Sequence, residues 1–185
     1  MRPLFTVHAG EFIVGEFIEK TFPGLDIWVP ARDTGVDLLV TGIRGQQALA
    51  LQVKLSRDYK PFEAKSDFDK RIVAAGWLTL DHEKLAKSKA DLWVVVLISH
   101  ERTMKPRFLV IPPHELLRRL SNTHGKLKKY HFYPWVTKDG KCLDGRGLMR
   151  AHKRQLVEGT IVLGTRDLSA YLGDWSALRK LSQRK

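Results

Sequence analysis

The stretch DTGVDLLVTGIRGQQALALQVKLSRDY, residues 33–59, contains two apolar segments with polar residues inside them. Asp37 stands in the first segment, and Gln52 and Lys54 stand two positions apart in the second. A buried charge without a partner is costly, so polar groups on neighbouring strands indicate that they surround a common ligand. A metal ion is the ligand that suits this set best.

The alternating pattern of residues 47–55 predicts a strand with two different faces. One face carries leucine and valine and is expected to pack on a helix. The other face carries Gln52 and Lys54 beside small residues. A turn expected at residues 42–45 pairs this strand with the preceding one, which places Asp37 on the same face.

The remaining elements are predicted from apolar spacing and turn residues. Over the first 120 residues the order is helix, three strands, helix, strand, strand, helix, which predicts an α/β fold. Residues 1–120 are expected to form the core, and residues 121–185 a small α+β C-terminal extension packed on it. Helices are expected at residues 9–20, 81–90, 113–120 and 167–181.

The composition indicates a polyanionic partner, with nucleic acid as the leading candidate. The chain has 32 Lys and Arg against 20 Asp and Glu, a net charge of +12 and a pI near 10.0. Cys142 is the only cysteine, which excludes a cysteine zinc cluster and fits a reducing cytoplasm. No apolar run approaches the roughly 18 residues of a membrane span, so no membrane partner is expected.

The polar set matches the chemistry of phosphodiester hydrolysis, in which water must be deprotonated and charge developing on the phosphate must be neutralised. Asp37 is expected to hold Mg²⁺, with Mn²⁺ as a substitute. The Gln52 side-chain oxygen and the Val53 carbonyl are further candidate ligands, because Mg²⁺ takes hard oxygen donors. Lys54 is expected to orient or activate the attacking water.

Gly35-Val36-Asp37, with Gln52-Val53-Lys54 beginning fifteen positions after Asp37, resembles the PD-(D/E)xK nuclease superfamily. The likeness is to its restriction-endonuclease-like and Holliday-junction resolvase-like members, and it covers about residues 8–112. It implies a restriction-endonuclease-like αβββαβ core with a mixed central sheet. It also implies a glutamate ligand on the first helix, and Glu16 is selected because it lies on the apolar arc of that helix.

The sequence departs from the motif at two positions. Val36 replaces the proline, which makes no contact with the metal, and Gln52 replaces an acidic residue. The second change removes a negative charge and predicts weaker metal binding. Three functions therefore stay open: a metal-dependent DNA endonuclease, a catalytically inactive nucleic-acid-binding module that keeps the nuclease fold, and a protein whose basic surface meets an acidic protein partner. An RNA-directed nuclease is a further subclass.

Basic residues outside the cluster are candidates for phosphate contacts, although an ordinary solvated surface explains Arg57, Lys84 and Lys87 equally well. Three of them belong to HGKLKKYHFYPW, residues 124–135, where alternating basic and aromatic residues suit phosphate contact and base stacking. Asp33 belongs either to a turn, which is favoured, or to the support of the metal site. A homodimer is expected because cutting both DNA strands usually takes two sites. The candidate nucleic-acid contacts are Arg57, Lys84, Lys87, Lys126, Lys128 and Lys129.

Overall fold

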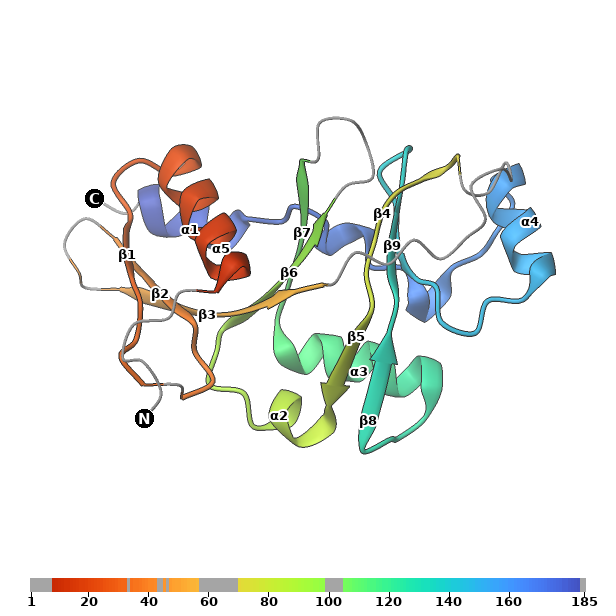
Figure 1. Ribbon diagram of the computed structural model, residues 1–185, viewed down its shortest axis with the longest axis horizontal. Helices are drawn as coiled ribbons and strands as arrows, with labels where there is room; N and C mark the ends of the chain where they lie inside the picture. The colour runs from red at the N-terminus through yellow and green to blue at the C-terminus, as the bar shows by residue number, and fades with distance from the viewer. Residues whose placement is uncertain are drawn as a thin grey trace.

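The computed structural model describes residues 8–32, 34–42, 45, 47–56, 70–98 and 105–183. In this part of the chain, helices and strands combine into a mixed α/β fold, which confirms the predicted class. Figure 1 shows α1, α5 and both chain ends on the left and α4 on the far right. None of the described helices is long and apolar enough to cross a membrane.

The central sheet is mixed, as predicted, and has the strand order β1-β2-β3-β6-β7. Strands β3 and β6 run parallel, whereas the other neighbouring pairs run antiparallel. Its strands are β1 (Asp26–Trp28), β2 (Leu38–Thr41), β3 (Ala48–Leu55), β6 (Leu92–Ile98) and β7 (Pro106–Ile111).

Strands β2 and β3 form the hairpin that the sequence predicts. Leu38, at the start of β2, pairs with Leu51 of β3. The turn depends on Gly45, whose φ of 65° suits glycine and whose N–H donates to the carbonyl of Gly42 at 2.8 Å. Strand β3 continues past Leu51 to Leu55, so its last residues have no partner in β2.

The two faces of the central sheet bury separate hydrophobic clusters. Val94 and Val96 of β6 pack on one face with residues of α1 and α5. Val95 and Leu97 pack on the other face with α3 and the smaller sheets. Burial on both faces accounts for the uninterrupted apolar sequence of β6. The helices are α1 (Ala9–Thr21), α2 (His82–Ala86), α3 (Pro113–His124), α4 (Arg150–Glu158) and α5 (Ser176–Gln183).

Two smaller sheets join residues 72–81 to the C-terminal part of the chain. Strand β4 pairs with β9, which also pairs with β10, and β5 pairs with β8. The sequence prediction missed β4 and β5 because their partners are distant in the sequence. Residues 121–185 are thus hydrogen-bonded to strands of the first 120 residues. These strands are β4 (Ile72–Ala75), β5 (Leu78–Asp81), β8 (Lys129–Phe132), β9 (Pro134–Thr137) and β10 (Cys142–Asp144).

The helix predicted at residues 167–181 is interrupted. Gly173 has φ 67°, and its N–H donates to the carbonyl of Phe108 in β7 at 2.7 Å, so the backbone leaves the helical path to contact the sheet edge. Asp174 then accepts the first N–H of α5 at 3.1 Å. The 3-10 helices of this region are η1 (Gly164–Arg166) and η2 (Ser169–Tyr171).

Glu115 links α3 to this C-terminal segment. Its carboxylate accepts two hydrogen bonds from Arg118 at 2.7 and 2.8 Å, one from Arg119 at 2.7 Å and one from the hydroxyl of Tyr171 at 3.0 Å. These bonds, with Arg118 contributing most, lower the pKa of Glu115 from 4.5 to about 2.

We expect the contribution of Glu115 to stability to be present above pH 4.5 and to be lost as the pH falls toward 2, because a lowered pKa stabilises the fold only while the carboxylate is ionised. Glu115→Gln should lower the free energy of unfolding at pH 7 by about 1–2 kcal/mol, allowing for solvent screening, and by less near pH 2. Urea unfolding at both pH values measures this. Glu158→Gln, which breaks an exposed pair with Arg154, is the control. An equal loss at both pH values for Glu115→Gln would contradict the expectation.

Candidate functional site

Asp37 directly precedes β2 and bonds the part of the β3 edge that β2 does not cover. Its backbone N–H donates to the carbonyl of Leu51 at 2.8 Å, as another strand residue would. Its side-chain Oδ2 accepts the N–H of Val53 at 2.7 Å and a further hydrogen bond from Nε2 of Gln52. The carboxylate therefore supplies the acceptor that a longer β2 would have provided.

Gln52 and Lys54 lie on the face of β3 opposite α1. Gln52 is buried and pairs in register with Trp93 of β6. The Nζ of Lys54 lies 5.6 Å from the centre of the Trp93 ring, within cation–π range. Ser88 holds this ring by accepting its Nε1–H at 2.9 Å. The structure thus brings Asp37 together with Gln52 and Lys54.

Glu16, the glutamate predicted on the first helix, does not line this site. Its side chain is 47% exposed, and its Oε1 pairs with Nζ of Lys20 at 2.6 Å. Glu11 faces the site instead and is only 8% exposed. Helix α1 buries Glu11 with Val14 and Ile18, at a spacing of three and seven residues, so its inner face is centred away from Glu16. The same spacing is present in the sequence, but it does not by itself show which part of the broad apolar arc of this helix contacts the sheet.

Close packing of α1 on β3 brings Glu11 to the cluster. A Cβ atom on Gly10 would lie 2.9 Å from the Cβ of Leu55 and 3.3 Å from Cγ1 of Val53, so glycine is needed at this contact. The Oε2 of Glu11 accepts the backbone N–H of His8 at 3.0 Å. The start of the helix is therefore held against the end of the strand.

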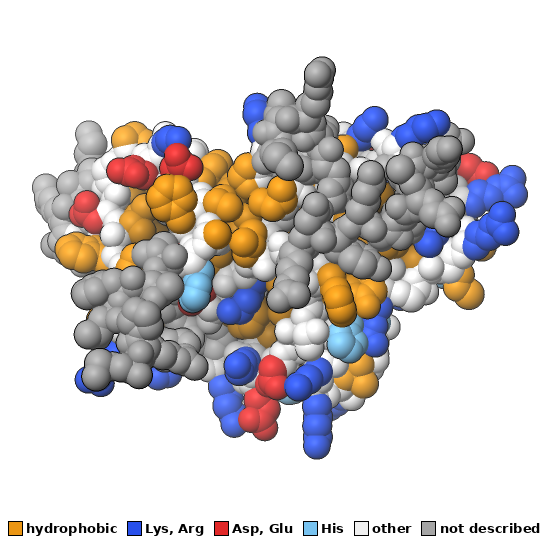
Figure 2. Space-filling model, viewed as in Figure 1, with side chains coloured by type: hydrophobic (Ala, Val, Ile, Leu, Met, Phe, Trp, Pro, Cys, Tyr) orange, Lys and Arg blue, Asp and Glu red, His pale blue; other side chains and the backbone are white. Residues whose placement is uncertain are grey.

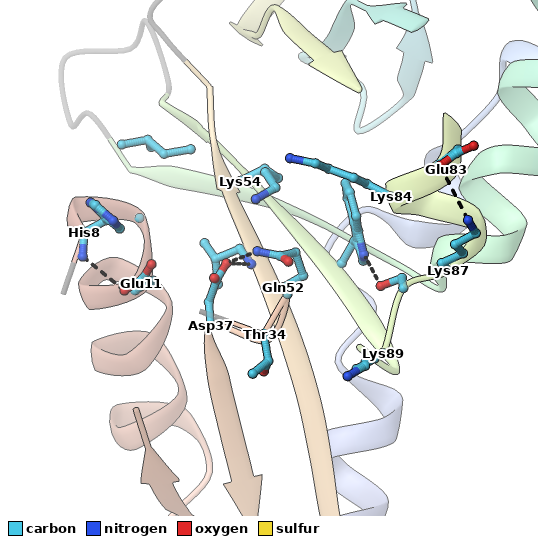
Figure 3. Close-up of a pocket in the computed structure, with 16 residues that line it drawn as sticks. His8, Glu11, Thr34, Asp37, Gln52, Lys54, Glu83, Lys84, Lys87 and Lys89 are labelled. Atoms are coloured by element: carbon cyan, nitrogen blue, oxygen red, sulfur yellow. Dashed lines mark hydrogen bonds and ion pairs between the residues drawn. The ribbon is translucent and has the colours of Figure 1, made fainter. Parts of the chain in front are cut away.

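A cavity of about 670 Å³ opens at the end of β3, and Glu11, Asp37, Gln52 and Lys54 line it. Figure 3 shows Glu11 of α1 and Asp37, which directly precedes β2, on one side. The lysines of α2 and of the residues after it lie on the other side, and Lys54 lies above Gln52. Such a cavity can place a phosphate between acidic and basic groups. Its ionisable lining residues are His8, Glu11, Asp37, Lys54, Glu83, Lys84, Lys87 and Lys89.

Only some of the candidate nucleic-acid contacts line the cavity. Lys84 and Lys87 line the cavity, where Lys87 Nζ also pairs with Glu83 at 3.5 Å. Three other lysines are exposed beside α2 and do not line the cavity: Lys126, Lys128 and Lys129. Figure 2 shows Lys and Arg side chains gathered around α2 at the lower edge of the view. Arg57 and Asp33 lie outside the described residues.

The oxygen atoms at the site suit a hard divalent cation in type, but they carry little negative charge. The described residues include no group of three or more His, Cys, Asp or Glu that could hold a metal ion. Asp37 supplies a carboxylate, whereas the Gln52 amide and the Val53 carbonyl, which points to the same strand edge as its N–H, supply neutral oxygens. Gln52 directs Nε2 toward Asp37, so its amide must rotate before its oxygen can become a ligand there.

Comparison of the chain with protein-family models found no match, and comparisons with curated proteins and with solved structures found none either. Any functional assignment therefore rests on the site itself.

We expect Asp37→Ala to lower the free energy of unfolding by about 1–3 kcal/mol, because it leaves a buried N–H of Val53 and the Gln52 amide without their acceptor. Asp37→Asn keeps one acceptor oxygen and should cost less. Urea unfolding of both variants measures the difference, with Glu16→Ala as an exposed control. Wild-type stability in Asp37→Ala would contradict the role of the carboxylate at the strand edge.

Proposed function

We propose that the protein is a metal-dependent DNA endonuclease that hydrolyses phosphodiester bonds at the end of β3. The observation that carries this proposal is the cluster of Asp37, Gln52 and Lys54 in one cavity, at neighbouring positions of a single hairpin. A carboxylate, an amide and an amine in this arrangement are the groups that phosphodiester hydrolysis needs.

The order of elements supports a restriction-endonuclease-like core. Helix α1, the meander β1-β2-β3, helix α2 and strand β6 follow one another as in the αβββαβ pattern, with β4 and β5 inserted before α2. The parallel pairing of β3 with β6 fits the same arrangement, because it places α2 within the crossover between the two strands.

Each polar residue of the cavity has a proposed role. Asp37, together with the Gln52 amide oxygen and the Val53 carbonyl, would hold Mg²⁺ or Mn²⁺, which neutralises phosphate charge and lowers the pKa of water. Glu11 adds a carboxylate from the α1 side and replaces Glu16 in this role. Lys54 positions the attacking water and donates hydrogen bonds to the phosphate.

The charge around the cavity supports a nucleic-acid substrate. Lys84, Lys87 and Lys89 line the side formed by α2, and the whole chain carries a net charge of +12. Neutralising several phosphates gives binding that weakens steeply as salt concentration rises. Cutting both strands of a duplex with this site would take two copies of the chain, so a homodimer belongs to the proposal.

One observation favours a second candidate function, a catalytically inactive nucleic-acid-binding module. The Gln52 amide donates to Asp37, so the cluster is hydrogen-bonded within the protein without an ion. Gln52 also lacks the charge that a carboxylate would give a metal ligand. Such a module would bind DNA without a divalent metal and would cut none.

The test is cleavage of plasmid, branched and single-stranded DNA and of RNA with Mg²⁺ or Mn²⁺. We expect Lys54→Ala and Asp37→Asn to reduce cleavage at least about 100-fold, because the first removes the amine that positions water and donates to the phosphate and the second removes the charged ligand of the metal ion. Glu11→Gln should impair cleavage, whereas its matched control Glu16→Gln should retain it. Unchanged rates in the Lys54 and Asp37 variants would overturn the assigned site. DNA binding by wild type without scission of any substrate would favour the inactive module.

Gln52→Glu separates the two candidate functions. Without metal, a second carboxylate beside Asp37 should lower the melting temperature, because like charges repel at short range. Mg²⁺ or Mn²⁺ should then raise the melting temperature of the variant more than that of wild type, since metal bound to the folded state stabilises it. Metal-dependent scission in both proteins supports the nuclease, and scission in the variant alone supports the inactive module. A variant that metal does not stabilise would contradict the metal site.

A further inference from the structure

An aromatic pair at the ends of β5 and β8 has no part in the site described above. Trp77 directly precedes β5, and Tyr133 directly follows β8. Their rings meet edge to face, with centroids 6.2 Å apart and planes at 85°. Trp77 is 47% exposed, so much of a large apolar ring faces solvent beside a second aromatic ring.

The pair lies on the outer face of the β5-β8 ladder. Leu80 and Tyr130 pair across the two strands and are buried on the inner face. Thr79 and His131 pair on the outer face, where Oγ1 of Thr79 lies 3.2 Å from Nδ1 of His131. Alternation along the strands brings Trp77 to this outer face with Thr79 and His131.

The aromatic pair is fixed to the strand that carries the candidate site. The N–H of Trp77 donates to Oγ of Ser56 at 2.8 Å, and the N–H of Ser56 donates to the carbonyl of Val96 in β6 at 3.0 Å. A Cβ atom on Gly76 would lie 2.5 Å from Oγ of Ser56, so only glycine permits this approach. Ser56 is two residues beyond Lys54, about 7 Å along the strand.

Tyr133 is held just as firmly. Its N–H donates to Oδ1 of the buried Asp144 at 3.3 Å, and its carbonyl accepts the N–H of Gly145 at 2.7 Å. The other carboxylate oxygen of Asp144 is bonded to Nε2 of His124. The two rings are therefore presented by a rigid backbone, which reduces the entropy lost when a ligand binds.

Two basic side chains lie along β8, the strand that Tyr133 directly follows. Nη1 of Arg146 donates to the carbonyl of His131 at 3.4 Å, so its guanidinium lies along β8. Lys129 is exposed at the far end of the same strand. In Figure 2, hydrophobic side chains in the region of β5 and β8 lie next to His and basic side chains. A flat apolar ligand with attached negative charge fits this surface better than a purely apolar one does.

We propose that Trp77 and Tyr133 form a stacking site for an unpaired base of a nucleic-acid strand whose backbone lies in the cavity beside Lys54. Aromatic side chains next to basic residues bind single strands in this way, because every base offers a ring face and the phosphates meet the cations. A base inside a duplex is already stacked, so this site selects single-stranded or splayed nucleic acid. The inference rests on the proposed function in taking nucleic acid as the partner and in placing its backbone in the cavity beside Lys54, but it does not require cleavage.

The test is binding in EDTA, where metal-dependent cleavage cannot occur, with oligodeoxythymidylate, oligouridylate and a DNA duplex as probes. Trp77→Ala should weaken single-strand binding about tenfold or more, whereas Trp77→Phe should retain most of it. Duplex binding should stay the same in both variants. Trp28→Ala is the matched control, since Trp28 is 57% exposed on the edge strand β1.

Tryptophan fluorescence gives a second measurement. In Trp28→Phe, Trp77 is the one exposed tryptophan, because the other three are each 3% exposed. Oligodeoxythymidylate should quench this emission and protect it from acrylamide.

Wild-type single-strand affinity in Trp77→Ala, or no quenching on binding, would overturn the stacking site and leave the nuclease proposal in place. Weakened binding by Trp77→Ala, together with no cleavage by wild type in the presence of metal, would support the stacking site and overturn the nuclease proposal.

Absence of nucleic-acid binding by wild type would overturn both the stacking site and the nuclease proposal. A shift from dimer to monomer in Trp77→Ala, with unchanged binding per chain, would assign the pair to an interface between copies and overturn the stacking site.

Discussion

Strand β3 is paired with β6 on one edge, but β2 covers its other edge only as far as Leu51. A buried strand cannot leave its N–H groups without acceptors, so the chain must supply one for Val53. Asp37 does so with its carboxylate, directly before β2 begins. The same constraint leaves the end of β3 open to a cavity, which α1 borders on one side and the segment around α2 on the other. The candidate site is therefore a consequence of two strands of unequal length.

The neutral amide of Gln52 avoids the electrostatic repulsion that a carboxylate at this position would have with Asp37. A carboxylate there would place two negative charges together at a largely buried position, which costs free energy without a cation between them. Gln52 avoids this cost by donating to Asp37, and the cluster is hydrogen-bonded within the protein. Lysines slightly outnumber carboxylates among the residues that line the cavity, so its charge balance is weakly positive.

The hydrophobic periodicity and turn residues of single segments were sufficient to predict much of the fold and part of the candidate site. The period-two alternation of β3 places Gln52 and Lys54 on one face whatever the rest of the chain does. The short turn to β2 places Asp37 beside them, because a hairpin with few turn residues restricts its register. Strand β6 and helix α1 were predicted for the same reason, since each carries its periodicity within its own residues. The sequence by itself therefore determined the mixed α/β class and the grouping of these three side chains.

Other features depended on partners that are distant in the sequence. An amphipathic helix can rotate on a sheet without any change in its pattern, so only its packing against β3 selected Glu11 over Glu16. Gly173 interrupts the last helix because its N–H contacts β7. The pairing of β5 with β8 brings Trp77 beside Tyr133, which no local periodicity predicts. Tertiary structure decided these features because each depends on contacts between segments whose relative position the local pattern does not restrict.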